Sequence, residues 1–311
     1  MNRILQDTSS SSSLFADPKV TQYGGHSVMS NVYKTGKYKY ITVDTRFQDN
    51  YYTYDSLSVA NFTLTLPERI NDVRSIMVCN VEVPMTFYNF SDEIGNTYFK
   101  LTYNSIVYMI KIDSGNYTMA EILAEVHAKV DTAIGNNKLT FDLSRNHSTI
   151  HNANGGYTAT IDFAVNVDGT PDKHNFKRKL GWFLGFRDTS YSLAPSATIR
   201  SENFVDIAGI RYAYLVLDEF GKGVQNSFKG FMPSSLVNKN IIAKITFNRT
   251  TFPYGTVLPA NNFNGYLLTD HRGYNGKINI QKMQVQLVDE FGNPINLNGM
   301  DLSFCIEAEY E

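Results

Sequence analysis

The feature that most constrains this chain is a series of short apolar runs with a period of two. Phe62, Leu64 and Leu66 alternate with threonines, and Pro67 should end this run because proline cannot donate to a strand ladder. Similar runs lie at residues 38–43, 70–83, 98–103, 107–112, 138–143, 157–165, 208–217, 241–247, 278–288 and 302–308. Clusters of Gly, Asn and Asp separate many of them. Many short strands with turn signals between them predict an all-β sandwich or barrel.

One helix is predicted within this strand-rich sequence. Thr118 and Glu121 fit a capping box, in which each side chain satisfies a backbone N–H at the start of the helix. Apolar residues then recur on one face, and Gly135 marks the expected end. A weaker helical pattern covers residues 173–186. Its first half is rich in Lys and Arg, and the near-zero net charge of the chain favours a solvated helix face over a phosphate site.

Composition limits the classes of protein that this chain can belong to. Of its 311 residues 42% are hydrophobic and 19% charged, which allows a substantial core and excludes a disordered chain. The formal net charge of -2 gives no reason to expect a specific nucleic-acid partner. Cys79 and Cys305 lie in apolar runs and cannot build a disulfide framework, so we expect them to be buried, reduced thiols. We find no apolar run of transmembrane length and no signal peptide, and expect a soluble protein made inside the cell.

Residues 1–36 differ from the rest of the sequence. A serine run at 9–13 and a glycine pair at 24–25 surround a few scattered apolar residues, including Leu14 and Phe15. Such a segment buries too little apolar surface to order by itself. The sequence therefore predicts a flexible N-terminal arm over residues 1–36, either disordered or ordered against a partner, followed by one domain over residues 37–311.

Residue patterns typical of enzymes are missing or better explained as structure. The sequence has no P-loop, dinucleotide fingerprint, nucleophile elbow or zinc-protease motif. The pairs Asp218-Glu219 and Asp289-Glu290 each precede a Phe-Gly after an apolar strand, and we interpret them as exposed turn carboxylates.

His147 and His151 have a spacing that would suit a metal only on a helix. Along a strand, four residues separate two rings by about 13 Å, so we interpret them as exposed hairpin histidines. The sequence predicts no catalytic, cofactor-binding or metal-ligating residue, and a protein that is not an enzyme.

Several segments, in order, resemble the single jelly-roll penton and minor capsid proteins of nucleocytoplasmic large DNA viruses and related virophages. They are residues 43–49 (VDTRFQD), 61–67 (NFTLTLP), 76–84 with 87–89 (FYN), 116–118 (NYT), 180–186 (LGWFLGF), 285–292 (VQLVDEFG) and 297–304 (LNGMDLSF). The C-terminal pair is the most specific. Together these segments extend over most of residues 40–311, whereas residues 1–36 show no family pattern.

The resemblance implies an eight-stranded jelly roll of two facing sheets. It also implies a homopentamer at the five-fold vertex of an icosahedral double-stranded DNA virus, among double jelly-roll major capsid proteins and other capsid proteins. The expected location is then the virion, after synthesis in the host cytoplasm, and a contact with an internal membrane stays open. The stretch over residues 98–186 is longer than a minimal jelly roll needs, so we expect a β/α insertion there.

Two other functions remain open at this point. One is a minor capsid or cement protein of the same fold at another capsid position. The other is a carbohydrate-binding or receptor-binding β-sandwich, because jelly rolls also serve as lectins.

Overall fold

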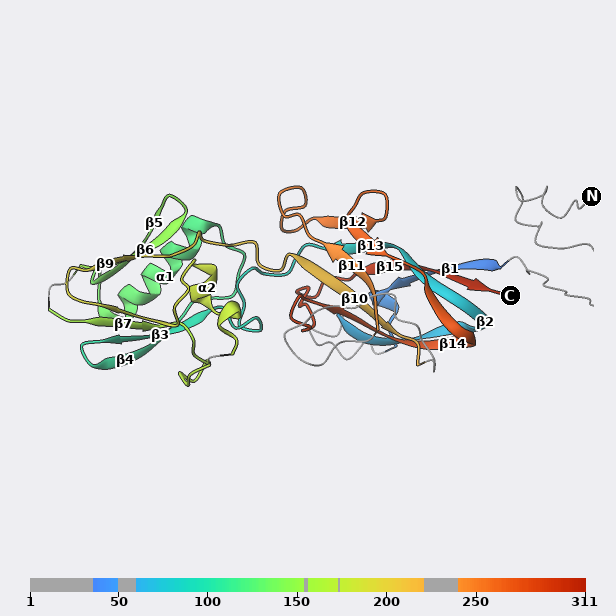
Figure 1. Cartoon of the computed structure of the whole chain (residues 1–311), viewed down its shortest axis with the longest axis horizontal. Coiled ribbons are helices and arrows are strands. Elements are labelled where there is room, and N and C mark those ends of the chain that lie inside the picture. Colours follow the sequence, from blue (N-terminus) through green and yellow to red (C-terminus); the bar gives the residue numbers. More distant parts are fainter. Residues whose placement is uncertain (1–35, 50–59, 154–155, 173, 221–239) are drawn as a thin grey trace, which may run out of the picture.

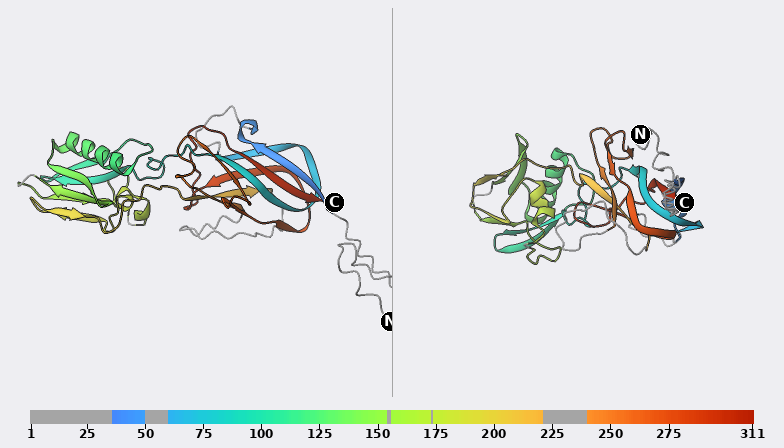
Figure 2. Two further views of the ribbon diagram at one scale, coloured as in Figure 1. Left: turned by 90° about the horizontal axis from the view of Figure 1, so that it is seen from above. Right: turned by 45° about the vertical axis from the view of Figure 1, so that its right-hand side comes forward.

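The structure is a computed structural model that describes residues 36–49, 60–153, 156–172, 174–220 and 240–311. The predicted N-terminal arm lies, except for Gly36, outside the described residues. Two bodies are visible, joined by two neighbouring stretches of chain (Figure 1). We call them the framework, which contains the C-terminus, and the inserted lobe, which is formed by the middle of the sequence (Figures 1 and 2).

The framework is one curled antiparallel sheet that forms both layers of a sandwich. Its strands are β1 (Lys37–Asp44), β2 (Asn61–Pro84), β10 (Tyr212–Asp218), β11 (Ile241–Thr246), β12 (Val257–Asn261), β13 (Leu267–Thr269), β14 (Arg272–Val288) and β15 (Ser303–Tyr310), with a short 3-10 turn, η2 (Thr45–Phe47), after β1. The strand order is β1-β15-β2-β14-β10-β11-β13, and β12 also pairs with β2. This eight-stranded antiparallel arrangement confirms the predicted all-β jelly roll.

Strand β2 belongs to both layers. Its first part pairs with β14, and the part from Val73 onward pairs with β15 and β12. The predicted end of the strand at Pro67 is therefore wrong, because β2 continues through this residue to Pro84. The register against β14 shifts between Ile280 and Lys282, opposite residues 65–70, so Pro67 lies in an irregular part of the ladder, where a missing N–H costs little.

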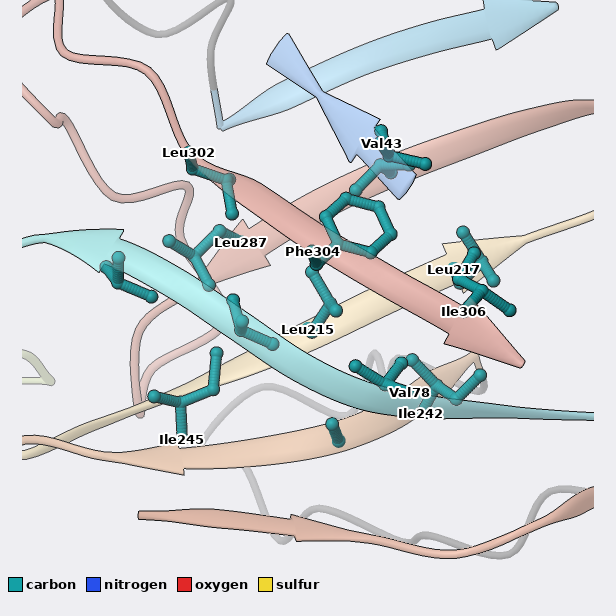
Figure 3. Packing of buried hydrophobic residues seen from close by; sticks show 14 of the residues in the cluster. Val43, Val78, Leu215, Leu217, Ile242, Ile245, Leu287, Leu302, Phe304 and Ile306 are labelled. Carbon is teal, nitrogen blue, oxygen red and sulfur yellow. The ribbon is translucent and has the colours of Figure 1, made fainter. Parts of the chain in front are cut away.

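The core of the framework lies between the two layers. The cluster contains Val285, Leu287, Phe304 and Ile306. Their alternate spacing along two strands predicts that they share one face, and all four are buried. Figure 3 shows Phe304 at the centre of this cluster, with side chains from β2, β10, β11 and β14 pointing toward it. Phe304 is 1% exposed, so the last strand is part of the core and not an appendage.

The inserted lobe lies between β2 and β10 in the sequence and has its own core. Its elements are β3 (Tyr98–Tyr103), β4 (Ile106–Lys111), α1 (Met119–Ile134), β5 (Leu139–Ser144), β6 (His147–Asn152), β7 (Ala159–Asp162), η3 (Phe176–Arg178), α2 (Leu180–Phe183), β8 (Ser190–Leu193) and β9 (Thr198–Arg200). They form a four-stranded sheet, β4-β3-β7-β8, and a three-stranded sheet, β5-β6-β9. The second hydrophobic cluster draws residues from Phe90 to Leu193, a longer stretch than residues 98–186.

Helix α1 follows the sequence prediction closely. Thr118 Oγ1 accepts from the Glu121 N–H and the Glu121 carboxylate accepts from the Thr118 N–H, which completes the capping box. Its apolar face packs into the lobe core and Gly135 closes it at φ 98°. The helix expected over residues 173–186 is much shorter than predicted, because a 3-10 turn and the four-residue α2 replace it.

Candidate assembly interface

Three of the segments that carry the family resemblance meet at one corner of the framework. Thr45 is fully buried, and its hydroxyl donates to Asp301 Oδ1 at 2.8 Å and accepts from the Leu302 N–H at 3.0 Å. The Asp49 carboxylate accepts from the N–H and the hydroxyl of Thr65, at 3.0 and 2.7 Å. The segments over residues 43–49, 61–67 and 297–304 are thereby fixed to one another by side-chain hydrogen bonds.

The outside of this corner is hollowed and partly apolar. A cavity of about 290 Å³ is lined by Asp44, Arg46, Glu82, Val257, Met300, Asp301, Leu302 and Ser303. Phe47 beside it is 79% exposed, Val257 55% and Met300 51%. We call Phe47, Val257, Met300 and the residues that line this cavity the corner surface. Large apolar side chains around a preformed hollow are typical of a protein contact.

The corner surface also has a fixed electrostatic pattern. Asp44 accepts from the Arg46 N–H and guanidinium, and this hydrogen bonding holds the pKa of the Asp44 carboxyl below its ordinary value. The Arg46 guanidinium lies 5.7 Å from the centre of the Phe47 ring. A charged pair next to exposed apolar side chains resembles the composition of an interface with a polar rim.

Two further exposed aromatic features lie on the framework. On the edge strand β1, Tyr38 is 56% and Tyr40 65% exposed. The Tyr40 hydroxyl hydrogen-bonds the Glu307 carboxylate, which raises the pKa of the phenol.

Phe263 is fully exposed at the tip of the β12–β13 loop, where the Asn261 side chain accepts from the backbone N–H groups of Phe263 and Asn264. The Asn- and Gly-rich residues 261–265 form a turn, and this turn presents an aromatic ring to solvent.

The two histidines considered as metal ligands have separate partners. Both lie on β6, in the expected hairpin with β5, but both are half-buried and not exposed as expected. His147 Nδ1 is 2.8 Å from the Ser201 carbonyl oxygen, and His151 Nδ1 is 2.8 Å from the Thr198 hydroxyl. Among the described residues no group of three or more His, Cys, Asp or Glu side chains is arranged to hold a metal ion.

The carboxylate pairs are not exposed, contrary to the sequence interpretation. Asp289-Glu290 lies in a turn as expected, whereas Asp218 is the last residue of β10 and the chain that follows Phe220 lies outside the described residues. Asp289 is 4% exposed because its Oδ1 accepts from the N–H groups of Phe291 and Asn293. Burial raises the pKa of its neighbour Glu290, whose carboxylate also accepts from the Arg211 N–H. A side chain that closes its own turn contributes to folding and does not require a catalytic role.

Glu219 of the other pair forms a buried ion pair. Its Oε2 lies 2.9 Å from Arg272 Nη1, and both side chains are at most 1% exposed. The same guanidinium donates to the carbonyl oxygens of Leu217 and Asn240, each at 2.7 Å. Arg272 therefore ties the end of β10 to the start of β11. No sequence pattern distinguished this arginine from a surface one.

The basic cluster near residue 177 is not a solvated helix face. Lys179 is 4% exposed and pairs with Asp172 at 3.0 Å. The Arg178 guanidinium lies 5.2 Å from the ring centre of Phe291, and Lys177 lies over Trp182. Lys177, Arg178 and Lys179 each make a different contact within the chain, and Arg178 connects the lobe to the framework, while Lys173 lies outside the described residues.

The Leu-Gly-Trp-Phe-Leu-Gly-Phe stretch at residues 180–186 is a packing motif of the lobe. Leu180, Leu184 and Phe186 are fully buried. Gly185 has φ 92°, and a Cβ there would lie 2.1 Å from the Asn203 carbonyl oxygen, so a larger residue cannot replace it. The resemblance in this segment reflects the lobe core and not a chemical site.

Comparisons with known proteins give structural similarity without sequence similarity. No family model and no curated protein matches the chain. It is similar to the crystal structure of the mavirus penton protein, with a TM-score of 0.44, 9% identity, and coverage of 88% of this chain and 100% of that chain. It is also similar to a chain of the 3.5 Å cryo-EM structure of the Sputnik virophage, with a TM-score of 0.41, 12% identity, and coverage of 88% and 98%. The jelly-roll assignment here rests on the strand order and pairing.

In the part of the chain that the structure describes, no helix has both the length and the apolar character needed to cross a membrane.

Proposed function

We propose that this chain is a structural capsid protein, the penton that forms homopentamers at the five-fold vertices of an icosahedral double-stranded DNA virus. One observation carries the proposal. Three segments that resemble penton and minor capsid proteins, residues 43–49, 76–84 and 297–304, supply residues of the corner surface, where hydrogen bonds fix a hollow and exposed apolar side chains surround it.

The geometry of the framework supports a ring. The corner surface lies at one end of the edge strand β1, which contributes Asp44 to it, and the exposed Tyr38 and Tyr40 lie toward the other end of that strand. Contacts between unlike surfaces repeat head to tail and close into a ring when the rotation between subunits allows it. In this proposal the corner surface provides one side of the subunit contact, and double jelly-roll major capsid proteins surround the pentamer in the virion.

The parts of the chain have separate tasks in this proposal. The framework makes the subunit contacts, and the inserted lobe projects from it at the end where β2 stops and β10 begins (Figure 1). The N-terminal arm of residues 1–36 is proposed to dock on a neighbouring capsid component. We propose no catalytic residue and no cofactor.

The oligomeric state of the purified chain tests the proposal. Light scattering coupled to gel filtration should give a pentamer, and the double variant Phe47→Ser/Met300→Ser should give monomers of unchanged circular dichroism. The matched control is Val167→Ser, which changes a 64% exposed side chain of the inserted lobe and should leave the pentamer intact. A stable two-fold dimer, or a pentamer that persists in the double variant, contradicts the proposed contact.

A further inference from the structure

The two cysteines, far apart in the sequence, lie on neighbouring strands. Cys79 belongs to β2 and Cys305 to β15, which pair antiparallel. Cys305 is opposite Asn80 and Ile306 is opposite Val78, so Cys79 is the extra residue of a β-bulge. Cys79 and Asn80 of β2 therefore both oppose Cys305 of β15, which brings the two cysteines next to each other.

Both thiols lie on the outer side of the sheet. Phe304 and Ile306, on either side of Cys305, point into the core, so Cys305 points away from it. Val78 beside Cys79 is fully buried, while Asn80 is exposed. Each cysteine is half-buried and neither forms a disulfide in this structure. The expectation of fully buried thiols is therefore wrong, and a small oxidant can approach them from solvent.

The backbone geometry suits a disulfide. Cys305 is directly opposite Asn80, and Cys79 is the second β2 residue of the same bulge, which places it next to Cys305 across the strand pair. Disulfides span Cα separations of about 4.4–6.8 Å, as between residues of neighbouring strands. The pKa of the Cys79 thiol also indicates that the two sulfurs are close. Burial raises the pKa of the Cys79 thiol to about 11, and the Cys305 thiol and the Glu307 carboxylate also contribute.

We propose that Cys79 and Cys305 form an intrachain disulfide when the protein leaves a reducing compartment, with a small disulfide such as oxidised glutathione as the oxidant. Each thiol loses its proton and one Sγ–Sγ bond forms. The two electrons reduce the disulfide of the oxidant to two thiols. The new bond joins the last strand to β2 and closes a loop that contains the inserted lobe. This inference is independent of the proposed capsid function.

The disulfide should stabilise the folded state by lowering the conformational entropy of the unfolded chain. A covalent link across a long loop removes conformational freedom that the unfolded chain would otherwise gain. Because the thiolate is the reactive form, the raised pKa of Cys79 makes the oxidation slow at neutral pH. Glu307 and Tyr40 are the other titratable groups beside the pair, and the Glu307 charge opposes ionisation of the thiol.

Peptide mapping of the full-length protein tests the proposal. The reduced chain is incubated with oxidised glutathione at about pH 9, where more thiolate is present, and digested with trypsin after remaining thiols are blocked. We expect one linked species that joins residues 75–100 to residues 283–311, and loss of both thiols. The oxidised protein should also melt about 3 °C or more above the reduced one.

The matched controls are Cys79→Ser and Cys305→Ser, each of which leaves one thiol. Neither variant should show a linked species, and neither melting temperature should rise on oxidation. If one variant fails to fold, the other and the wild-type peptide map still decide the result. Persistence of both thiols, separate attachment of glutathione to each cysteine, or a covalent link between two chains would overturn the proposal.

Discussion

The same substitution, phenylalanine to alanine, can be made at two positions at opposite extremes of burial, Phe304 and Phe263. Phe304 is 1% exposed at the centre of the framework core, whereas Phe263 is fully exposed on a loop. Replacing a buried phenylalanine with alanine removes its transfer free energy and leaves a cavity, which together cost about 3–5 kcal/mol. Phe263→Ala should change the free energy of unfolding by less than about 0.5 kcal/mol.

Urea denaturation followed by two probes measures this difference. With a slope near 2 kcal/mol per molar urea, Phe304→Ala should lower the framework midpoint by about 2 M. The single tryptophan, Trp182, lies in α2 of the inserted lobe, so its fluorescence reports on the lobe core. Far-UV circular dichroism reports on both bodies. The Trp182 transition should therefore move much less than the circular dichroism transition.

The reasoning would be refuted by equal midpoints for the two variants. It would also be refuted if Phe304→Ala shifted the Trp182 transition as much as the framework transition. That outcome would mean that the two hydrophobic clusters unfold as one cooperative unit.

Three further predictions concern polar side chains. Glu219→Gln should destabilise the fold by about 3–5 kcal/mol because it leaves the buried Arg272 charge unpaired, and a Glu219→Leu/Arg272→Met double variant should recover most of that loss in thermal melts. Burial raises the pKa of Glu290 in the folded state, so the folded protein binds more protons than the unfolded one; stability should fall as pH rises from about 4.5, and Glu290→Gln should flatten that slope in a pH series of melts. Thr118→Ala should cost about 1 kcal/mol through loss of the capping box, whereas Thr118→Ser should cost little.

The local parts of the fold could be predicted from the sequence. Alternation over residues 285–287 and 304–306 predicted the core face correctly, because a strand has only two faces and water excludes one of them. The start of α1 was predicted for a similarly local reason, since Thr118 and Glu121 satisfy donors within one turn.

Features that depend on contacts between distant parts of the chain could not be predicted from the sequence. Pro67 normally ends a strand, but here the ladder is irregular at the position where β2 passes from one layer to the other. The burial of Lys179 and Arg272 depends on partners distant in sequence, and a single sequence holds no signal for such pairs. The corner surface combines residues of the segments 43–49, 76–84 and 297–304, which the sequence analysis named without placing them together, with Val257, which it did not name.

The connection between the two bodies suggests how such proteins diversify. The Asn89 side-chain amide donates to the Ile207 carbonyl at 3.0 Å, and Gly209 packs against the Asn89 backbone, so the chain enters and leaves the lobe at nearly the same place. A segment whose ends already touch can be exchanged for a short turn or for another module without moving the strands that flank it. In the proposed capsid role, the framework would keep its subunit contacts, and the exterior of the particle would change only where the lobe is exchanged.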